Sequence, residues 1–235
     1  MNDQQPGRLR RIAAPLAVLL VIAGAVALVF GVRAQHHPPQ PPPSAAIEQP
    51  VVPAGSSNSP GSPTGQGGSP GKLATRGPLL ARSVPVSIWI PAIGVRSDLL
   101  QLGLNPDHTV QVPPLSRNSQ AGWYRYSPTP GQLGPSVILG HVDSAEYGPG
   151  IFFRLGALRQ GDLVEVTRSD HSVGVFRIER VVSYPKDHFP TLAVYGNTDH
   201  AALRLITCGG KFDFSTHNYQ SNIVAYASLI SSRHS

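Results

Sequence analysis

The sequence predicts an all-β domain, a closed barrel or a sandwich, that follows a membrane-spanning helix and a long linker. Two observations carry this prediction. From residue 81 onward, short runs of β-branched and apolar residues alternate with turns that contain Gly or Pro. Before residue 81, one long apolar run is followed by a stretch rich in Pro, Ser and Gly. The later part, about 150 residues, is long enough to bury one hydrophobic core.

Composition argues against several classes of protein. The 235 residues carry a net charge of +6, and the six basic and two acidic residues in 1–80 account for +4 of it. The rest of the chain is nearly neutral and lacks the basic stripe that binds a phosphate backbone, so we expect no nucleic-acid partner. A single cysteine forms no intramolecular disulfide and supplies no Cys-rich zinc site.

Residues 12–32 are predicted to form a transmembrane signal-anchor helix. They contain no charged side chain, and a helix of 21 residues spans the roughly 30 Å core of a bilayer. Arg8, Arg10 and Arg11 precede the run, which places residues 1–11 in the cytoplasm and the rest outside the cell. A cleaved signal peptide is the alternative, although the run exceeds a usual h-region. The expected location is therefore the cell membrane, with a single pass.

Residues 33–80 are predicted to be a disordered linker, and residues 81–231 the folded domain. The linker has no apolar periodicity and consists largely of Pro, Ser, Gly, Gln and Ala, which bury too little apolar surface to offset the entropy of ordering. His36 and His37 lie in this tract and are more simply interpreted as incidental than as metal ligands.

Seven short segments of the folded part read as strands, and one reads as a short helix. The strand candidates are 84–91, 109–114, 136–141, 162–167, 174–184, 202–208 and 222–230, and the helix candidate is 150–158.

Two residues stand at strand ends beside glycines and could carry chemistry. In "LRLITCGG", alternation places Leu203, Leu205 and Thr207 on one face and Arg204, Ile206 and Cys208 on the other. Cys208 closes the strand, and two glycines follow.

In "VILGHVDS", His141 likewise follows an apolar run and Gly140. At one barrel mouth, proton exchange between Cys208 and His141 would give the thiolate–imidazolium pair that a cysteine nucleophile needs. Ordinary packing roles are the alternative for both. A free thiol outside the cytoplasm is liable to oxidation, however, which favours a nucleophile.

These residues resemble the sortases, the cysteine transpeptidases on the outer face of Gram-positive bacteria. "LITC" resembles their TLxTC signature, and "GHVDS" resembles the region around their histidine. The order of further segments is similar to the actinobacterial class F, across about residues 84–230. These segments are "IPAIGV" (90–95), "LGLNPDHTVQVPP" (102–114), "GWY" (122–124), "PGQLGPSVILGHVDS" (130–144), "FFRLGALRQGD" (152–162) and "TCGGKFD" (207–213).

The resemblance implies an eight-stranded β-barrel with short helices and an enzyme that needs no cofactor. Cys208 would attack the carbonyl after Thr in a C-terminal sorting motif of the LPxTG type and form a thioester. His141 would be the general acid and base. The implied partners are sorting-signal peptides of surface proteins and an amine from a peptidoglycan precursor or a pilin.

The chain departs from the family at the arginine that supports the substrate and oxyanion. "KFDFSTHNYQSNIVAYA" contains no arginine. Arg204 lies four residues from Cys208, about 13 Å along a strand, which is too far to bind an oxyanion at the sulfur. Phe214, Gln220 and Asn222 remain candidates for the position. Asn222 and the backbone N–H groups at Gly209 and Gly210 are candidate donors, and a neutral donor replaces a charged one only in part.

Two other functions remain as hypotheses. The missing arginine suggests a catalytically weak sortase-like module that binds sorting motifs or wall peptides. An L,D-transpeptidase also pairs Cys with His, but "LITCGGKF" lacks the His and Arg expected beside its cysteine. Asp143 and Glu146 fall short of the 6–8 oxygen ligands of a dedicated calcium site, so we expect no metal.

Overall fold

The computed structural model describes residues 38–42 and 75–234. The chain divides into two units, Met1–His37 and Pro38–Ser235, and all elements below belong to the second. In the described part, no helix is long and apolar enough to cross a membrane. The predicted span at 12–32 lies outside that part.

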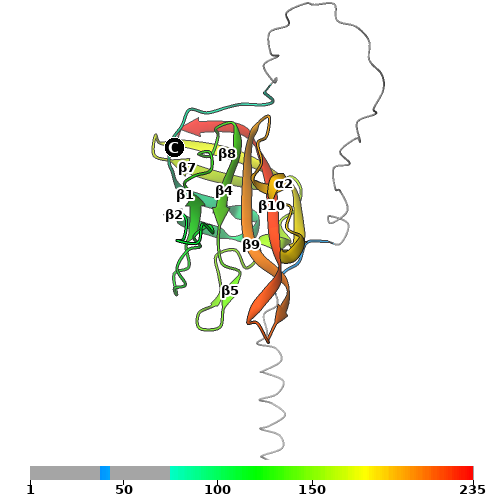
Figure 1. Cartoon of the computed structure of the whole chain (residues 1–235). Coiled ribbons are helices and arrows are strands. Elements are labelled where there is room, and N and C mark those ends of the chain that lie inside the picture. The colour runs from blue at the N-terminus through cyan, green and yellow to red at the C-terminus, as the bar shows by residue number, and fades with distance from the viewer. Residues whose placement is uncertain (1–37, 43–74, 235) are drawn as a thin grey trace, which may run out of the picture. The chain divides into compact units, whose positions relative to one another are not determined.

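Eight strands form a closed barrel, and two more form a small hairpin (Figure 1). The barrel strands are β1 (Pro85–Ile90), β2 (Val95–Leu102), β3 (Ala121–Tyr124), β4 (Gly134–Leu139), β7 (Leu163–Arg168), β8 (Ser172–Pro185), β9 (Ala201–Asp213) and β10 (Asn218–His234). The hairpin joins β5 (Asp143–Ser144) to β6 (Gly148–Pro149), and the short helices are η2 (Pro91–Ile93), η3 (Leu155–Ala157), η4 (Lys186–His188) and α2 (Thr191–Tyr195). The order around the barrel is β1-β2-β3-β4-β9-β10-β8-β7, and β7 pairs with β1. The predicted all-β, eight-stranded barrel is confirmed.

Parallel pairing of β4 with β9 brings two distant segments to one end of the barrel. Leu139 is the register partner of Ile206, and the N–H of Gly140 donates to the Ile206 carbonyl at 3.1 Å. Because parallel strands end at the same edge, the residues that follow β4 lie beside the later part of β9.

Six of the seven predicted strands are confirmed, and 109–114 is wrong. Val110 makes only an isolated bridge to Leu104, and Pro113 and Pro114 lack the N–H groups that a ladder needs. β2, β3 and α2 were not predicted, and the predicted helix at 150–158 is only a single 3₁₀ turn, η3.

Side chains alternate between the barrel interior and a second cluster outside it. Leu203 and Leu205 are fully buried in the interior cluster. Ile206 and Tyr226 belong to the outer cluster, which also contains Val194 of α2. The predicted alternation along 203–208 therefore holds, and α2 covers part of the outer face beside β9.

Residues 38–42 and the segment that begins at residue 75 both pack on the barrel. Arg76 forms a two-bond ion pair with Asp199, its Nε lying 2.6 Å from Oδ2. Residues 38–42, the blue segment in Figure 1, form a short strap against η3 and β9. Pro38 is buried, and Gln40 Oε1 accepts a hydrogen bond from the Gly210 N–H at 2.9 Å. The unit that contains the barrel thus includes residues assigned to the linker by sequence.

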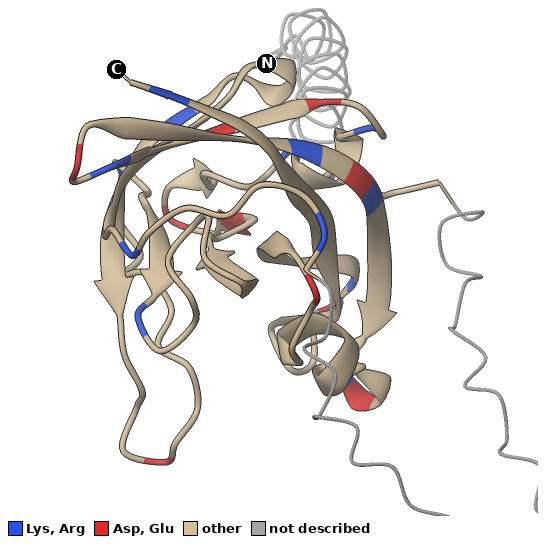
Figure 2. Ribbon diagram, turned by 90° about the horizontal axis from the view of Figure 1, so that it is seen from above, with Lys and Arg blue, Asp and Glu red and all other residues tan. Residues whose placement is uncertain are grey.

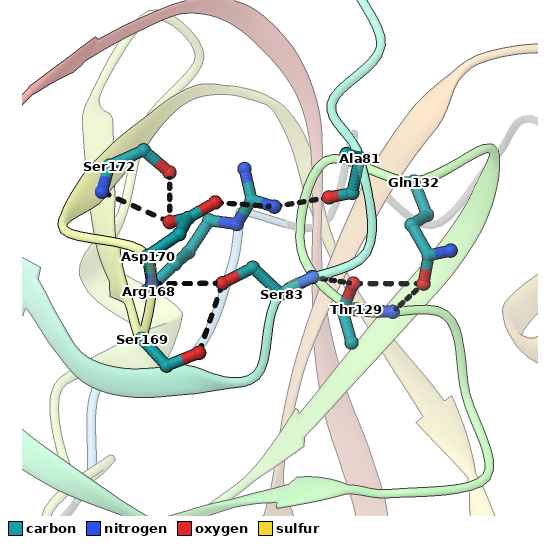
Figure 3. Close-up of polar contacts among 8 residues, drawn as sticks. All are labelled: Ala81, Ser83, Thr129, Gln132, Arg168, Ser169, Asp170 and Ser172. Carbon is teal, nitrogen blue, oxygen red and sulfur yellow. Dashed lines mark hydrogen bonds and ion pairs between the residues drawn. The ribbon is translucent and has the colours of Figure 1, made fainter.

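A buried arginine joins the chain entering β1 to the end of β7 (Figure 3). Arg168 is 2% exposed; it donates to the Ala81 carbonyl and lies 3.4 Å from Asp170. The Ser83 hydroxyl accepts from the Asp170 N–H at 3.1 Å, and the Ser83 N–H donates to Thr129. These bonds fix the start of the barrel at the end opposite the site described next.

Candidate active site

Cys208 lies on the outer face of β9, opposite Asn222. The two are register partners across β9 and β10, and Asn222 is in turn the partner of Tyr184 on β8. Cys208 is a half-buried free cysteine. Its neighbour Thr207 is buried on the inner side, so alternation alone turns the thiol outward.

Cys208 and Asn222 line a groove with a volume of about 810 Å³. Most of its surface is apolar. The remaining lining residues are His108, Thr109, Val110, Val112, Tyr124, Leu139, Gly140, Lys186, Phe189, Thr191, Tyr195, Ile206 and Thr207. A groove of this size with a nucleophilic side chain fits an extended peptide of a few residues.

His141 follows Gly140 at the end of β4, beside β9. Its Nε2 lies 2.6 Å from the Pro113 carbonyl. A carbonyl only accepts, so Nε2 donates, and the lone pair of the neutral ring is on Nδ1. Pro113 thus fixes both the ring orientation and the tautomer.

The structure brings Cys208 and His141 to the same end of the barrel but does not join them by a hydrogen bond. Gly140 lines the groove with Cys208, whereas His141 lines a small neighbouring cavity. Apo active sites often show such open geometry and tighten when substrate binds.

A hydrogen bond connects the segment after His141 to the strand opposite Cys208. The Tyr219 hydroxyl on β10 donates to Asp143 Oδ2 on β5 at 2.5 Å. Burial, this hydrogen bond and the negative charge of Asp143 raise the pKa of Tyr219 well above its usual value. Tyr219 therefore stays a neutral donor.

The two glycines after Cys208 have separate roles. Gly209 is buried, and a Cβ there would lie 2.5 Å from Ile223 Cδ1. Gly210 has φ +75°, which favours glycine, and its N–H is bonded to Gln40.

Two basic side chains, Arg204 and Lys186, could be considered for the role of the missing arginine, and their environments differ. Arg204 is buried with its guanidinium 4.4 Å from the Tyr226 ring, and burial lowers its pKa to about 10. It does not line the groove. Lys186 does, and its Nζ donates to Asn218 Oδ1 at 2.7 Å.

Sequence reasoning missed Lys186, Tyr219 and the role of Asp143 beside it. A lysine between Pro185 and Asp187 carries no local signal of a groove. Within residues 38–42 and 75–234, no group of three or more His, Cys, Asp or Glu side chains could hold a metal ion. Asp143, considered above as a calcium ligand, binds Tyr219 instead.

Comparison with known protein families identifies the family of this chain. A family model described as "Sortase domain" matches residues 88–230, more than half of the chain, so the chain belongs to the sortase family. No curated protein matches the chain.

Solved structures of several sortases are similar to the chain. Sortase A of Listeria monocytogenes is 19% identical with a TM-score of 0.47, over 66% of this chain and 92% of that one. A sortase D5 transpeptidase of Clostridium perfringens is 20% identical with a TM-score of 0.46, over 63% and 79%. The SrtA sortase of Actinomyces oris is 17% identical with a TM-score of 0.47, over 66% and 84%.

Proposed function

We propose that the chain is a membrane-anchored cysteine transpeptidase of the class F type that cleaves a C-terminal LPxTG-type motif after Thr. The observation that carries this proposal is the single thiol of a sortase domain, half-buried in an apolar groove that fits an extended peptide. The protein would join the sorted polypeptide to an amine of the cell wall or of a pilin.

In the first step, Cys208 Sγ bonds to the Thr carbonyl carbon, and the C–N bond to the next residue breaks. His141 donates a proton to the leaving amine. In the second step an amine attacks the thioester, the C–S bond breaks, and His141 accepts the proton of the attacking amine. Nδ1 is the nitrogen free for both transfers, since Nε2 is bonded to Pro113.

The oxyanion of each step needs donors in the groove. Asn222 lies opposite Cys208 and offers an amide N–H. In the described chain, Lys186 is the one Lys or Arg that lines the groove and supplies positive charge there. Together they supply what the family obtains from its arginine.

The proposal is tested with the full chain in detergent and a library of sorting peptides. Because the chain has one cysteine, any thiol adduct lies on Cys208. We expect a thioester by mass spectrometry and release of hydroxamate with hydroxylamine. Cys208→Ala should abolish both, and His141→Gln should lower the rate of adduct formation. Cleavage by Cys208→Ala at the wild-type rate would refute the assignment.

A catalytically weak binding module is the second candidate. It is favoured by the bond that holds His141 to Pro113 and by the absence of a bond between His141 and Cys208 in the described structure. Such a module would bind the same peptides and form no thioester. Protease treatment of intact cells, with tags at each terminus, tests the proposed membrane topology separately.

A further inference from the structure

A second opening, distinct from the groove that contains Cys208, lies near His141 and is lined by three arginines. Its volume is about 360 Å³. Arg96 comes from β2, Arg117 from the loop before β3 and Arg154 from the turn before η3. We call this opening the arginine cleft. Its other lining residues are Ile93, Gly94, Val95, Asn118, Ser119, Pro149, Gly150, Ile151 and Phe153.

The charge of the arginine cleft is not neutralised by its surroundings. No Asp or Glu lines it, and within the described residues none of the three guanidinium groups forms an ion pair or donates a hydrogen bond. Arg96 rests instead on the Trp89 ring, with its Cζ 5.0 Å from the ring centroid. Elsewhere charges of both signs are interspersed around the barrel (Figure 2), and some arginines, such as Arg233, are paired. Unpaired guanidinium groups bind oxyanions, since their N–H forks match phosphate and carboxylate oxygens.

Backbone hydrogen bonds connect the wall of the arginine cleft to the segment that carries His141. The cleft and the small cavity beside His141 share Ser119, Pro149 and Gly150 in their walls. The Phe152 N–H donates to the His141 carbonyl at 3.0 Å, and the Gly150 N–H donates to the Val142 carbonyl at 2.8 Å. The cleft therefore lies next to the segment that carries His141, and it shares no lining residue with the groove.

We propose that the arginine cleft binds an oxyanion, phosphate or carboxylate, carried by the amine acceptor. This inference rests on the proposed function and names the class of its second substrate. The acceptor's anionic group binds the arginines while its free amine reaches the thioester past His141. The amine nitrogen bonds to the acyl carbon, the C–S bond to Cys208 breaks, and the amine proton passes to His141.

The test uses the full chain and three acceptors of equal length, Gly-Gly-Ser, Gly-Gly-Glu and Gly-Gly-phosphoserine. Transfer to each is measured as the ratio of aminolysis to hydrolysis of the same thioester. We expect both anionic acceptors to have a lower KM than Gly-Gly-Ser, and the advantage to shrink as salt rises, because exposed charges are screened. Comparison of Glu with phosphoserine distinguishes a carboxylate from a phosphate ligand.

Variants locate the effect. Arg96→Gln, Arg117→Gln and Arg154→Gln should each reduce the anionic advantage by up to about fivefold, as exposed pairs do. The triple variant should remove it and leave hydrolysis unchanged. Arg177→Gln is the matched control, since Arg177 is an exposed arginine of β8 that does not line the cleft.

Direct binding keeps the inference separate from the activity. In Cys208→Ala, titration with Gly-Gly-phosphoserine should change the tryptophan fluorescence, because Arg96 rests on the Trp89 ring. If no thioester forms in the wild type, the proposed function fails. The titration then still shows whether the arginine cleft binds the anionic peptide. A thioester that reacts equally with all three acceptors would overturn the inference. So would an anionic advantage that survives the triple variant, or one that Arg177→Gln reduces equally.

Discussion

Tyr219 donates a hydrogen bond of 2.5 Å to Asp143, and this bond links the two halves of the candidate site. Asp143 is two residues after His141, and Tyr219 is on the strand paired with the Cys208 strand. The bond therefore limits how far the imidazole segment can move from the thiol.

Tyr219→Phe should lower the rate of thioester formation by roughly 10- to 100-fold. It removes one hydrogen bond to a carboxylate, worth about 1.5–3 kcal/mol, and leaves the aromatic packing with Phe212. The effect should appear in kcat more than in KM, and Asp143→Asn combined with Tyr219→Phe should cost little more than either alone. Tyr147→Phe is the control, because Tyr147 lies in the same hairpin as Asp143. Additive losses in the double variant would contradict a shared role.

Lys186→Met should slow thioester formation by about tenfold, because the groove loses its positive charge near the oxyanion. Lys186→Arg should retain most of the rate. Lys211→Met is the matched control, since Lys211 is exposed three residues after Cys208 and does not line the groove. Single-turnover kinetics separate this step from aminolysis. Equal rates for Lys186→Met and the wild type would exclude Lys186 from the step.

Protonation of Asp170 should lower the stability of the fold in acid. Hydrogen bonds from Ser172 lower its pKa from 3.8 to about 2, with a smaller contribution from Arg168. Its contribution to stability is therefore complete above about pH 4 and is lost as the pH falls to about 2.

Thermal unfolding tests this by comparing Asp170→Asn with the wild type from pH 6 downward. The variant should have a lower Tm at pH 6, and the gap between the two Tm values should close as the pH falls. Ser172→Ala should move the closing of the gap to higher pH. A gap that stays constant down to pH 2 would argue against a role for this carboxylate.

The strap at residues 38–42 should protect one amide beside the thiol. Gln40→Ala removes the acceptor of the Gly210 N–H, so hydrogen exchange at Gly210 should speed up by about tenfold. Gly156→Val should act similarly, since a Cβ at 156 would lie 2.1 Å from the Pro39 carbonyl oxygen. Gln49→Ala, another linker glutamine next to a proline, is the control. Slow exchange at Gly210 in both strap variants would show that the strap does not dock.

Features of the site with a local signal could be predicted from the sequence. Cys208 and His141 each combine the end of an apolar strand with an adjacent glycine, and strand alternation places the thiol on the outer face. The family resemblance added the barrel and its closure. Asn222 was one of several candidates in the same segment, and only the register of β9 and β10 sets it opposite Cys208.

Features built from residues far apart in the sequence could not be predicted. Asp143 and Tyr219 are 76 positions apart, and neither has a neighbour that indicates the other. β3 has four residues, too few for an alternating pattern. At 109–114 the alternation of "TVQV" suggests a strand, but formation of a ladder depends on a partner and on backbone N–H groups, which the two prolines lack.

The groove and the arginine cleft share no lining residue, and this has a kinetic consequence. With a single opening, the cleaved fragment would have to leave before an acceptor could enter, and steady-state plots would show parallel lines. With two separate openings, an acceptor can be bound while the fragment is still in place. We therefore expect intersecting lines at low concentrations of both substrates, the pattern of a ternary complex.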